Sequence, residues 1–202
     1  MDVDPVQTVE SLREEASATT QRHARLNAAV AISVAILATF MGICKVKDDN
    51  IVQAMQQAQA DKLDHWSYYQ ARNVRQEVAE ATLTQLRLAR AGRSGAEAAA
   101  YDTEIARYAA LAADQAKKKL EVKAQAEQDQ KAYDALNFRD DQFDLSDALL
   151  AIAIALLAVT ALTQLWWLYW LAWVPMGFGV LMGVAGLGGL GIHPDALVKL
   201  LS

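Results

Sequence analysis

The chain has 202 residues, of which 53% are hydrophobic, and a formal net charge of −5. Its charges are segregated, because residues 27–44 and 148–192 contain no Asp, Glu, Lys or Arg, and this excludes an ordinary soluble domain. The single cysteine, Cys44, excludes an internal disulfide framework, and the absence of a dominant basic stretch argues against nucleic acid as a partner.

Residues 1–25 form a polar segment that we predict to be helical. Asp4 is suited to the N-cap of a helix and Pro5 to its first position, and no glycine or proline follows before Gly42. The acidic start, MDVDPVQTVESLREE, is not typical of a cleavable signal peptide.

Residues 26–44, LNAAVAISVAILATFMGIC, form the first predicted transmembrane helix. This length of helix spans about 28 Å, which matches a hydrocarbon core of about 30 Å. Basic residues flank both ends, and we expect their long side chains to reach the headgroups as interfacial anchors. These anchors are Arg22, Arg25, Lys45 and Lys47.

Residues 45–147 are predicted to form a long antiparallel, coiled-coil-like helical hairpin with its tip at 91–95. The segment is rich in strong helix formers and contains no proline. Gly92 would end the first arm in a left-handed conformation, and Ser94 and Glu97 have the spacing of a capping box that starts the second arm. Gly95 completes the predicted tip.

The predicted interface between the two arms is thin, since alanine separates the larger apolar residues. A narrow interface buries little area, so we expect additional support from other copies, other membrane proteins or the membrane anchors. The residues near helical spacing are Met55, Leu63, Trp66, Val74, Val78 and Leu86 on the first arm and Tyr101, Ile105, Tyr108, Ala112, Ala116 and Leu120 on the second.

The second uncharged block is long enough for two crossings. Residues 148–165 are the second predicted transmembrane helix, and residues 166–192 are an aromatic turn followed by a glycine-rich third helix, with a tail at 193–202. Tryptophans near the divide are expected to lie at the interface as anchors: Trp166, Trp167, Trp170 and Trp173. A re-entrant or interfacial third segment remains an alternative to a full crossing.

Small residues recur in the third segment, PMGFGVLMGVAGLGGLG. Small residues four apart allow helix backbones to approach closely in lipid, either within one chain or between two copies. The predicted membrane-packing residues are Gly179, Gly183, Ala185 and Gly189.

A search for chemistry predicts no catalytic residue, cofactor site or metal site. The nearest metal candidate is the pair Asp61 and His65, which are four residues apart on one helical face but lack further ligands. The run Lys117–Lys119 lies between acidic residues and is typical of a solvated face. The uncharged crossings disfavour active transport.

Basic residues near the membrane boundaries favour a cytoplasmic hairpin. The N-terminal side offers Arg13, Arg22 and Arg25, whereas the hairpin side offers a larger set. That set is Lys45, Lys47, Lys62, Lys131, Arg139 and Lys199.

Residues 46–78, VKDDNIVQAMQQAQADKLDHWSYYQARNVRQEV, resemble a family of uncharacterised bacterial membrane proteins that is catalogued as a domain of unknown function. The matching positions are 47–50 and 64–70. The resemblance implies a multi-pass protein of the bacterial inner membrane and brings no known activity with it.

The sequence thus predicts an all-α membrane protein that is not an enzyme. Its leading predicted function is a scaffold or accessory subunit that self-associates, binds the lipid bilayer, contacts other membrane proteins and projects a hairpin. A homo-oligomeric passive channel, with the hairpins as a stalk or vestibule, is the alternative; a membrane enzyme with an unrecognised site is a third possibility.

Overall fold

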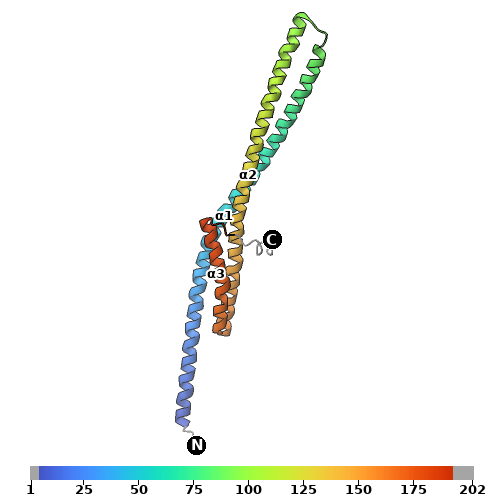
Figure 1. The fold of residues 1–202 in the computed structure, drawn as a ribbon. Coiled ribbons are helices and arrows are strands. Elements are labelled where there is room, and N and C mark those ends of the chain that lie inside the picture. Colours follow the sequence, from blue (N-terminus) through green and yellow to red (C-terminus); the bar gives the residue numbers. More distant parts are fainter. Residues whose placement is uncertain (1–4, 193–202) are drawn as a thin grey trace. The chain divides into compact units, whose positions relative to one another are not determined.

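A computed structural model describes residues 5–192, and the regular structure in this range is entirely α-helical. Helix α1 runs over Pro5–Arg90, α2 over Gly95–Thr163 and α3 over Trp166–Gly188 (Figure 1). Each helix contains a stretch long and apolar enough to cross a membrane. The predicted all-α class, with three transmembrane candidates and a long helical hairpin, is confirmed.

The chain divides into two compact units. The first, here called the membrane unit, comprises Met1–Val52 and Phe138–Ser202, and the second, the hairpin unit, comprises Gln53–Asn137. Helix α1 begins at Pro5, the predicted first helical position, whereas Asp4 and the tail at 193–202 lie outside the described residues.

Both long helices pass from one unit into the other without a break in helical structure. Residues 44–53 of α1 and 137–148 of α2 are helical throughout, since no proline or glycine interrupts them. Asp144 and Ser146, just before the second uncharged block, therefore lie inside α2 and do not start a new helix. With no helix start at this point, their side chains are available for contacts with other helices.

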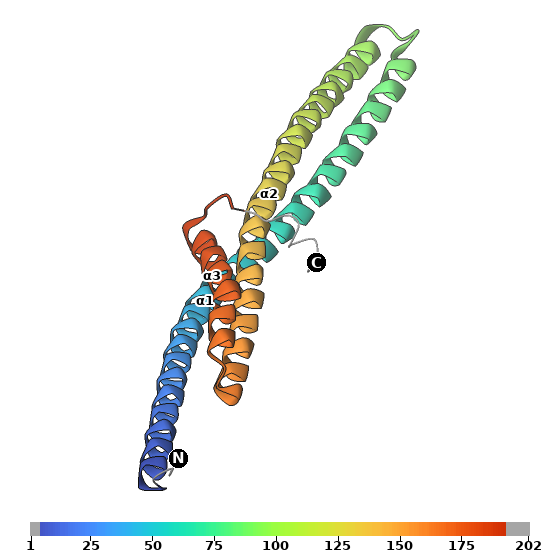
Figure 2. The same ribbon diagram turned by 60° about the horizontal axis from the view of Figure 1, so that its bottom comes forward.

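The membrane unit packs segments of all three helices around a small apolar core (Figure 2). Residues separated by three, four or seven positions supply one face of each helix. The buried residues of this core are Leu26, Val30 and Leu37 from α1, Leu150, Ala153 and Leu157 from α2, and Tyr169 and Ala172 from α3. Larger apolar side chains on the outer faces remain exposed, as expected where lipid is the solvent.

A two-residue turn connects α2 to α3. Gln164 adopts a positive φ of 58°, and its side-chain amide donates to Asn27 Oδ1 at 2.9 Å. The predicted aromatic turn is thus wrong in its position, because Trp166 already begins α3 and the aromatic residues are helical. A helix of 23 residues spans about 35 Å and is long enough for a full crossing.

The hairpin unit consists of the C-terminal part of α1 and the N-terminal part of α2, which lie side by side and meet at the tip (Figure 1). Gly92 and Gly95 both have the left-handed backbone that glycine tolerates, with φ of 78° and 66°. Glu97 lies in the first turn of α2 and pairs with Arg93. Arg90 closes the tip by donating from Nε to Asp102 Oδ1 at 2.8 Å.

Fewer large apolar side chains are buried between the two arms than the apolar pattern of the sequence predicted. The buried residues of this interface are mainly alanines, joined by Met55 and Leu83. The predicted interface residues Leu63, Val74, Val78 and Leu120 are instead exposed. Polar side chains take the facing positions, because alanine brings the arms close enough for cross-arm hydrogen bonds. These bonds join Lys62 to Gln130, His65 to Asp129, Arg72 to Gln115 and Lys119 to Asn73.

Candidate functional site: a carboxylate cluster in the membrane unit

A group of four aspartates lies where α1 and α2 meet beside their apolar segments, and the pKa of the three on α2 is raised, mainly by burial. Asp48 projects from α1 and is only 4% exposed. Asp140, Asp144 and Asp147 come from α2, where spacings of four and three residues place them on one face of the helix. We call these four residues the carboxylate cluster.

Lys45 supplies the positive charge of this cluster. Its Nζ donates to Asp48 Oδ2 at 2.8 Å and lies 3.6 Å from Asp49 Oδ1. The hydrogen bond with Asp48 raises the pKa of Lys45, so this side chain is held in its charged form. Lys45 is thus an exposed counter-ion of the buried Asp48 carboxylate, and it lies at the predicted membrane boundary.

Asp140 is the most strongly perturbed member of the cluster. Burial, the hydrogen bond with Asp48 and the nearby charge of Asp144 raise the pKa of Asp140 to about 6. The buried Oδ1 of Asp48 has no hydrogen-bond partner within residues 5–192. A protonated carboxyl group can donate a hydrogen bond and an ionised one cannot, so the neighbouring Asp48 favours the protonated form of Asp140.

A second set of α2 side chains binds the C-terminal end of α3. Arg139 donates from Nη2 to the carbonyl of Gly186 at 2.8 Å, and Gln142 donates from Nε2 to the carbonyl of Leu190 at 2.7 Å and of Ile192 at 2.6 Å. The last carbonyls of a helix lack intrahelical donors and carry the negative end of its dipole. Arg139 satisfies one of these carbonyls, and Gln142 binds the segment that directly follows α3.

Glycines bring α3 into direct contact with its neighbours. A methyl group added at Gly179 would lie 2.8 Å from Leu150 Cγ, and one added at Gly186 would lie 2.9 Å from Phe143 Cζ. Ser146 is fully buried and donates to the carbonyl of Gly179 at 2.8 Å. The close approach expected of small residues in lipid is thus made within one chain.

The predicted membrane-packing residues fall into two groups. Gly179, Gly183 and Ala185 are buried against the rest of the membrane unit. Gly189 instead ends α3 with a left-handed φ of 65°, and its N–H donates to the carbonyl of Ala185. Gly186 joins the packing face although it was not predicted, because it follows Gly179 by seven residues and Gly183 by three.

The predicted interfacial anchors are mostly exposed. Arg22, Arg25 and Lys47 lie on the surface of α1. Trp166, Trp167, Trp170 and Trp173 are exposed on α3 around the buried ring of Tyr169, which makes edge-on contacts with three of them. The Tyr169 hydroxyl lies 3.2 Å from Ser33 Oγ, so its polar end is satisfied inside the unit.

The two residues of the sequence-based metal candidate have different partners in the structure. Asp61 Oδ1 accepts a hydrogen bond from Gln57 at 2.8 Å on its own arm, whereas His65 Nδ1 lies 2.6 Å from Asp129 Oδ2 on the other arm. Within residues 5–192 no group of three or more His, Cys, Asp or Glu side chains is suited to hold a metal ion. The run 117–119 has local partners, such as Lys118 paired with Asp114 at 2.8 Å.

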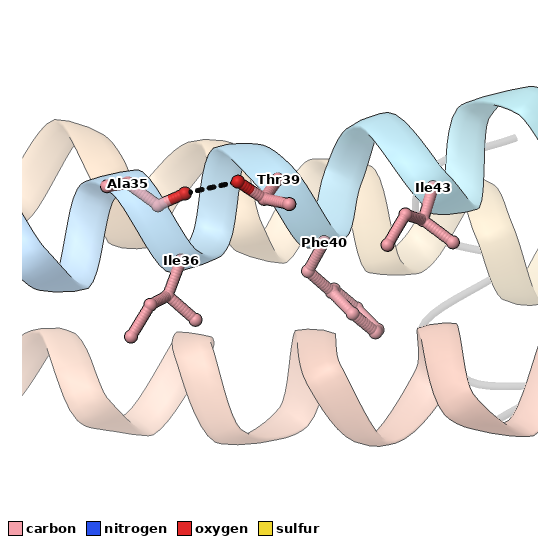
Figure 3. Close-up of a pocket in the computed structure, with 5 residues that line it drawn as sticks. All are labelled: Ala35, Ile36, Thr39, Phe40 and Ile43. Atoms are coloured by element: carbon pink, nitrogen blue, oxygen red, sulfur yellow. Dashed lines mark hydrogen bonds between the residues drawn. The ribbon is translucent and has the colours of Figure 1, made fainter.

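A shallow apolar groove of about 380 Å³ lies along α1 in the membrane unit. Ile36 and Phe40 project from α1 toward α3, and Ile43 continues the lining (Figure 3). The one hydroxyl in the groove, on Thr39, donates to the carbonyl of Ala35 at 2.8 Å. The groove therefore presents a hydrocarbon surface that lipid chains can fill.

Sequence reasoning overlooked the carboxylate cluster. The available signal was the position of the aspartates close to the two uncharged blocks: Asp48 comes four residues after the first block, and Asp144 comes four residues before the second. Helices entering a membrane side by side bring such positions together. The spacing of 140, 144 and 147 adds that these carboxylates share one helical face.

The fold and the site define an all-α protein with three helices suited to span a membrane and a helical hairpin joined to them. Residues 26–189 match the family described as a domain of unknown function, DUF4337, and the chain belongs to that family. No curated protein and no solved structure gives a significant match to the chain.

Proposed function

We propose that this protein is a non-enzymatic scaffold or accessory subunit of the bacterial inner membrane. Three crossings anchor it, and it self-associates and carries a helical hairpin outside the bilayer, on the cytoplasmic side. The supporting observation is how the membrane unit uses its polar side chains. Arg139 and Ser146 hydrogen-bond to α3 carbonyls, and Gln142 hydrogen-bonds to the carbonyl of Leu190 directly after α3. Such contacts fix the helices to one another and favour a rigid anchor.

The alternative, an oligomeric passive channel, has weaker support. A pore needs polar groups that face a shared axis. Here Ser33 contacts Tyr169, Gln164 contacts Asn27, and Thr160 is fully buried with its hydroxyl bonded to the carbonyl of Leu156. These intramembrane polar groups are used within the chain.

Two measurements on the full-length protein test this proposal. Light scattering in detergent should give a mass of at least two copies, and ion flux in liposomes should not exceed that of protein-free vesicles. A strict monomer in detergent and in liposomes would contradict self-association. Ion flux that depends on the protein would favour the channel instead.

The side of the hairpin is tested by labelling a Ser94→Cys variant in intact and lysed cells. The tip residue Ser94 is exposed, whereas the native Cys44 is 1% exposed and serves as the internal unreactive control. A cytoplasmic hairpin predicts labelling with an impermeant reagent only after lysis. Labelling in intact cells would place the hairpin on the opposite side.

A further inference from the structure

Helix α1 presents a second apolar face in the hairpin unit, on the side away from α2. Leu63, Val74, Val78 and Leu88 are 58%, 58%, 59% and 73% exposed. At about 100° per residue these four side chains and the exposed Ala81 fall within an arc of about 80°. We call this set the outer stripe.

The outer stripe is distinct from the interface between the arms. Ala79 and Leu83 are buried against the second arm, and by the same helical geometry they project from the opposite side of α1. Between its apolar members the outer stripe contains only uncharged residues, such as Ser67, Gln70 and Gln85. Because only one of the two apolar faces of α1 is covered by α2, the outer stripe is an apolar surface that lacks a partner.

Lipid does not account for this stripe. Exposed apolar residues in the membrane unit are solvated by hydrocarbon, but the hairpin unit contains the polar, charged segment that separates the apolar blocks. The outer stripe also lacks the basic borders by which an amphipathic helix binds an anionic bilayer, since Glu77 lies along one edge and Arg75 along the other.

We propose that the outer stripe binds the outer stripe of a second copy of this chain, in parallel and in register. This inference rests on the proposed membrane anchoring and self-association, because two copies inserted by identical crossings project their α1 arms in the same direction and place each stripe residue at the same height. Identical apolar residues then meet across a two-fold axis over about 38 Å, the length of helix from Leu63 to Leu88.

The charges at the edges of the stripe fit this arrangement. In a parallel two-fold pair, each edge of one helix faces the opposite edge of its partner. Glu77 therefore faces Arg75 of the second copy, and the two positions differ by two residues along the helix axis. Glu77 accepts a hydrogen bond from Asn73 at 2.7 Å on its own helix, which leaves its second oxygen for that contact.

Cysteine cross-linking in liposomes tests the contact directly. In the full chain with Cys44→Ala, a Val74→Cys variant should form a disulfide-linked dimer at least about tenfold more readily than Leu120→Cys. Leu120 is the matched control, because it is 64% exposed on the other arm. Equal yields from the two positions, or cross-linking of Val74→Cys only to a different protein in native membranes, would overturn the proposal.

Charge variants provide a second test, with circular dichroism to confirm unchanged helicity. Val74→Glu should halve the mass measured in detergent, whereas Leu120→Glu should leave it unchanged. Arg75→Glu should weaken association, and the double variant Arg75→Glu/Glu77→Arg should restore it. If the wild type is oligomeric and Val74→Glu remains so, the stripe is not the interface although self-association stands. If the wild type is monomeric throughout, both proposals fail.

Discussion

Gly183 of α3 lies directly against the ring of Phe40 on α1, and a methyl group added at Gly183 would be 2.7 Å from Cε1 and Cζ of that ring. The same methyl group would lie 2.8 Å from Ser146 Oγ on α2. One glycine thus sets the distance between three helices. Small residues of α3 such as Gly183 therefore pack against the interior of this chain.

Replacing Gly183 by alanine should destabilise the membrane unit. Overpacking of this kind typically costs about 1–3 kcal/mol, which corresponds to a decrease in Tm of about 2–12 °C for a chain of this size. Gly177→Ala is the matched control on the same helix, because nothing lies within 4 Å of the added methyl group. Thermal unfolding in detergent compares the two, and an equal Tm for both variants would contradict the packing described.

The stability of the membrane unit should depend on the ionisation of Asp140. Its pKa is raised to about 6 in the folded chain, so between about pH 4 and 6 the folded state binds more protons than the unfolded state. The higher pKa of Asp140 therefore adds to the free energy of unfolding at low pH. This stabilising contribution is fully present below about pH 4, and it is lost as the pH rises through about 6. The groups that set it are Asp48, Asp144 and Asp141, which oppose ionisation together with burial.

Asp140→Asn removes that titration while keeping a donor for Asp48. We expect the variant to match the wild type at pH 4.5 and to exceed its stability by about 1 kcal/mol at pH 7.5, or about 2–4 °C in Tm, after allowance for solvent screening. The control is Asp134→Asn, an exposed aspartate of the hairpin unit. If the Tm of Asp140→Asn changed with pH in the same way as the Tm of the wild type, the carboxyl groups of Asp140 and Asp48 would not interact.

His65 and Asp129 should be energetically coupled across the hairpin. Their 2.6 Å contact is partly buried in a narrow interface, where few large apolar residues contribute to stability. We expect His65→Ala and Asp129→Ala each to destabilise the hairpin and the double variant to cost less than their sum, with a coupling of about 0.5–3 kcal/mol. Chemical unfolding of the four proteins gives this coupling, and strictly additive effects would argue against the contact.

The exposed tryptophans of α3 should lie at the membrane interface. In a Trp66→Phe background, the remaining tryptophans are Trp166, Trp167, Trp170 and Trp173. Their indole N–H groups favour the boundary between water and hydrocarbon. Lipids brominated near the headgroup should therefore quench their fluorescence more than lipids brominated near the chain end. Stronger quenching by the deeper bromines would place the start of α3 inside the hydrocarbon core.

Local properties of the sequence determined much of this fold. Charge segregation located the three helices that are long and apolar enough to cross a membrane. The pair Gly92 and Gly95 located the hairpin tip, because glycine reaches backbone conformations that other residues avoid. The same reasoning misplaced the start of α3, since Trp166 favours an interface equally well in a turn or in the first turn of a helix. Periodicity also assigned Val74 and Val78 to the wrong face, because it shows that a helix has an apolar face without showing which neighbour covers it.

The sequence by itself therefore determined which segments are helical, where they turn and which of them suit lipid, since each of these depends on residues close together in the chain. Only the tertiary structure decided that Asp48 meets Asp140, that Gly183 receives Phe40 and that Arg139 binds the end of α3. Those contacts join residues distant in the chain, and they depend on the rotation of each helix about its axis. That rotation is fixed by close packing between helices, which no single helix can specify.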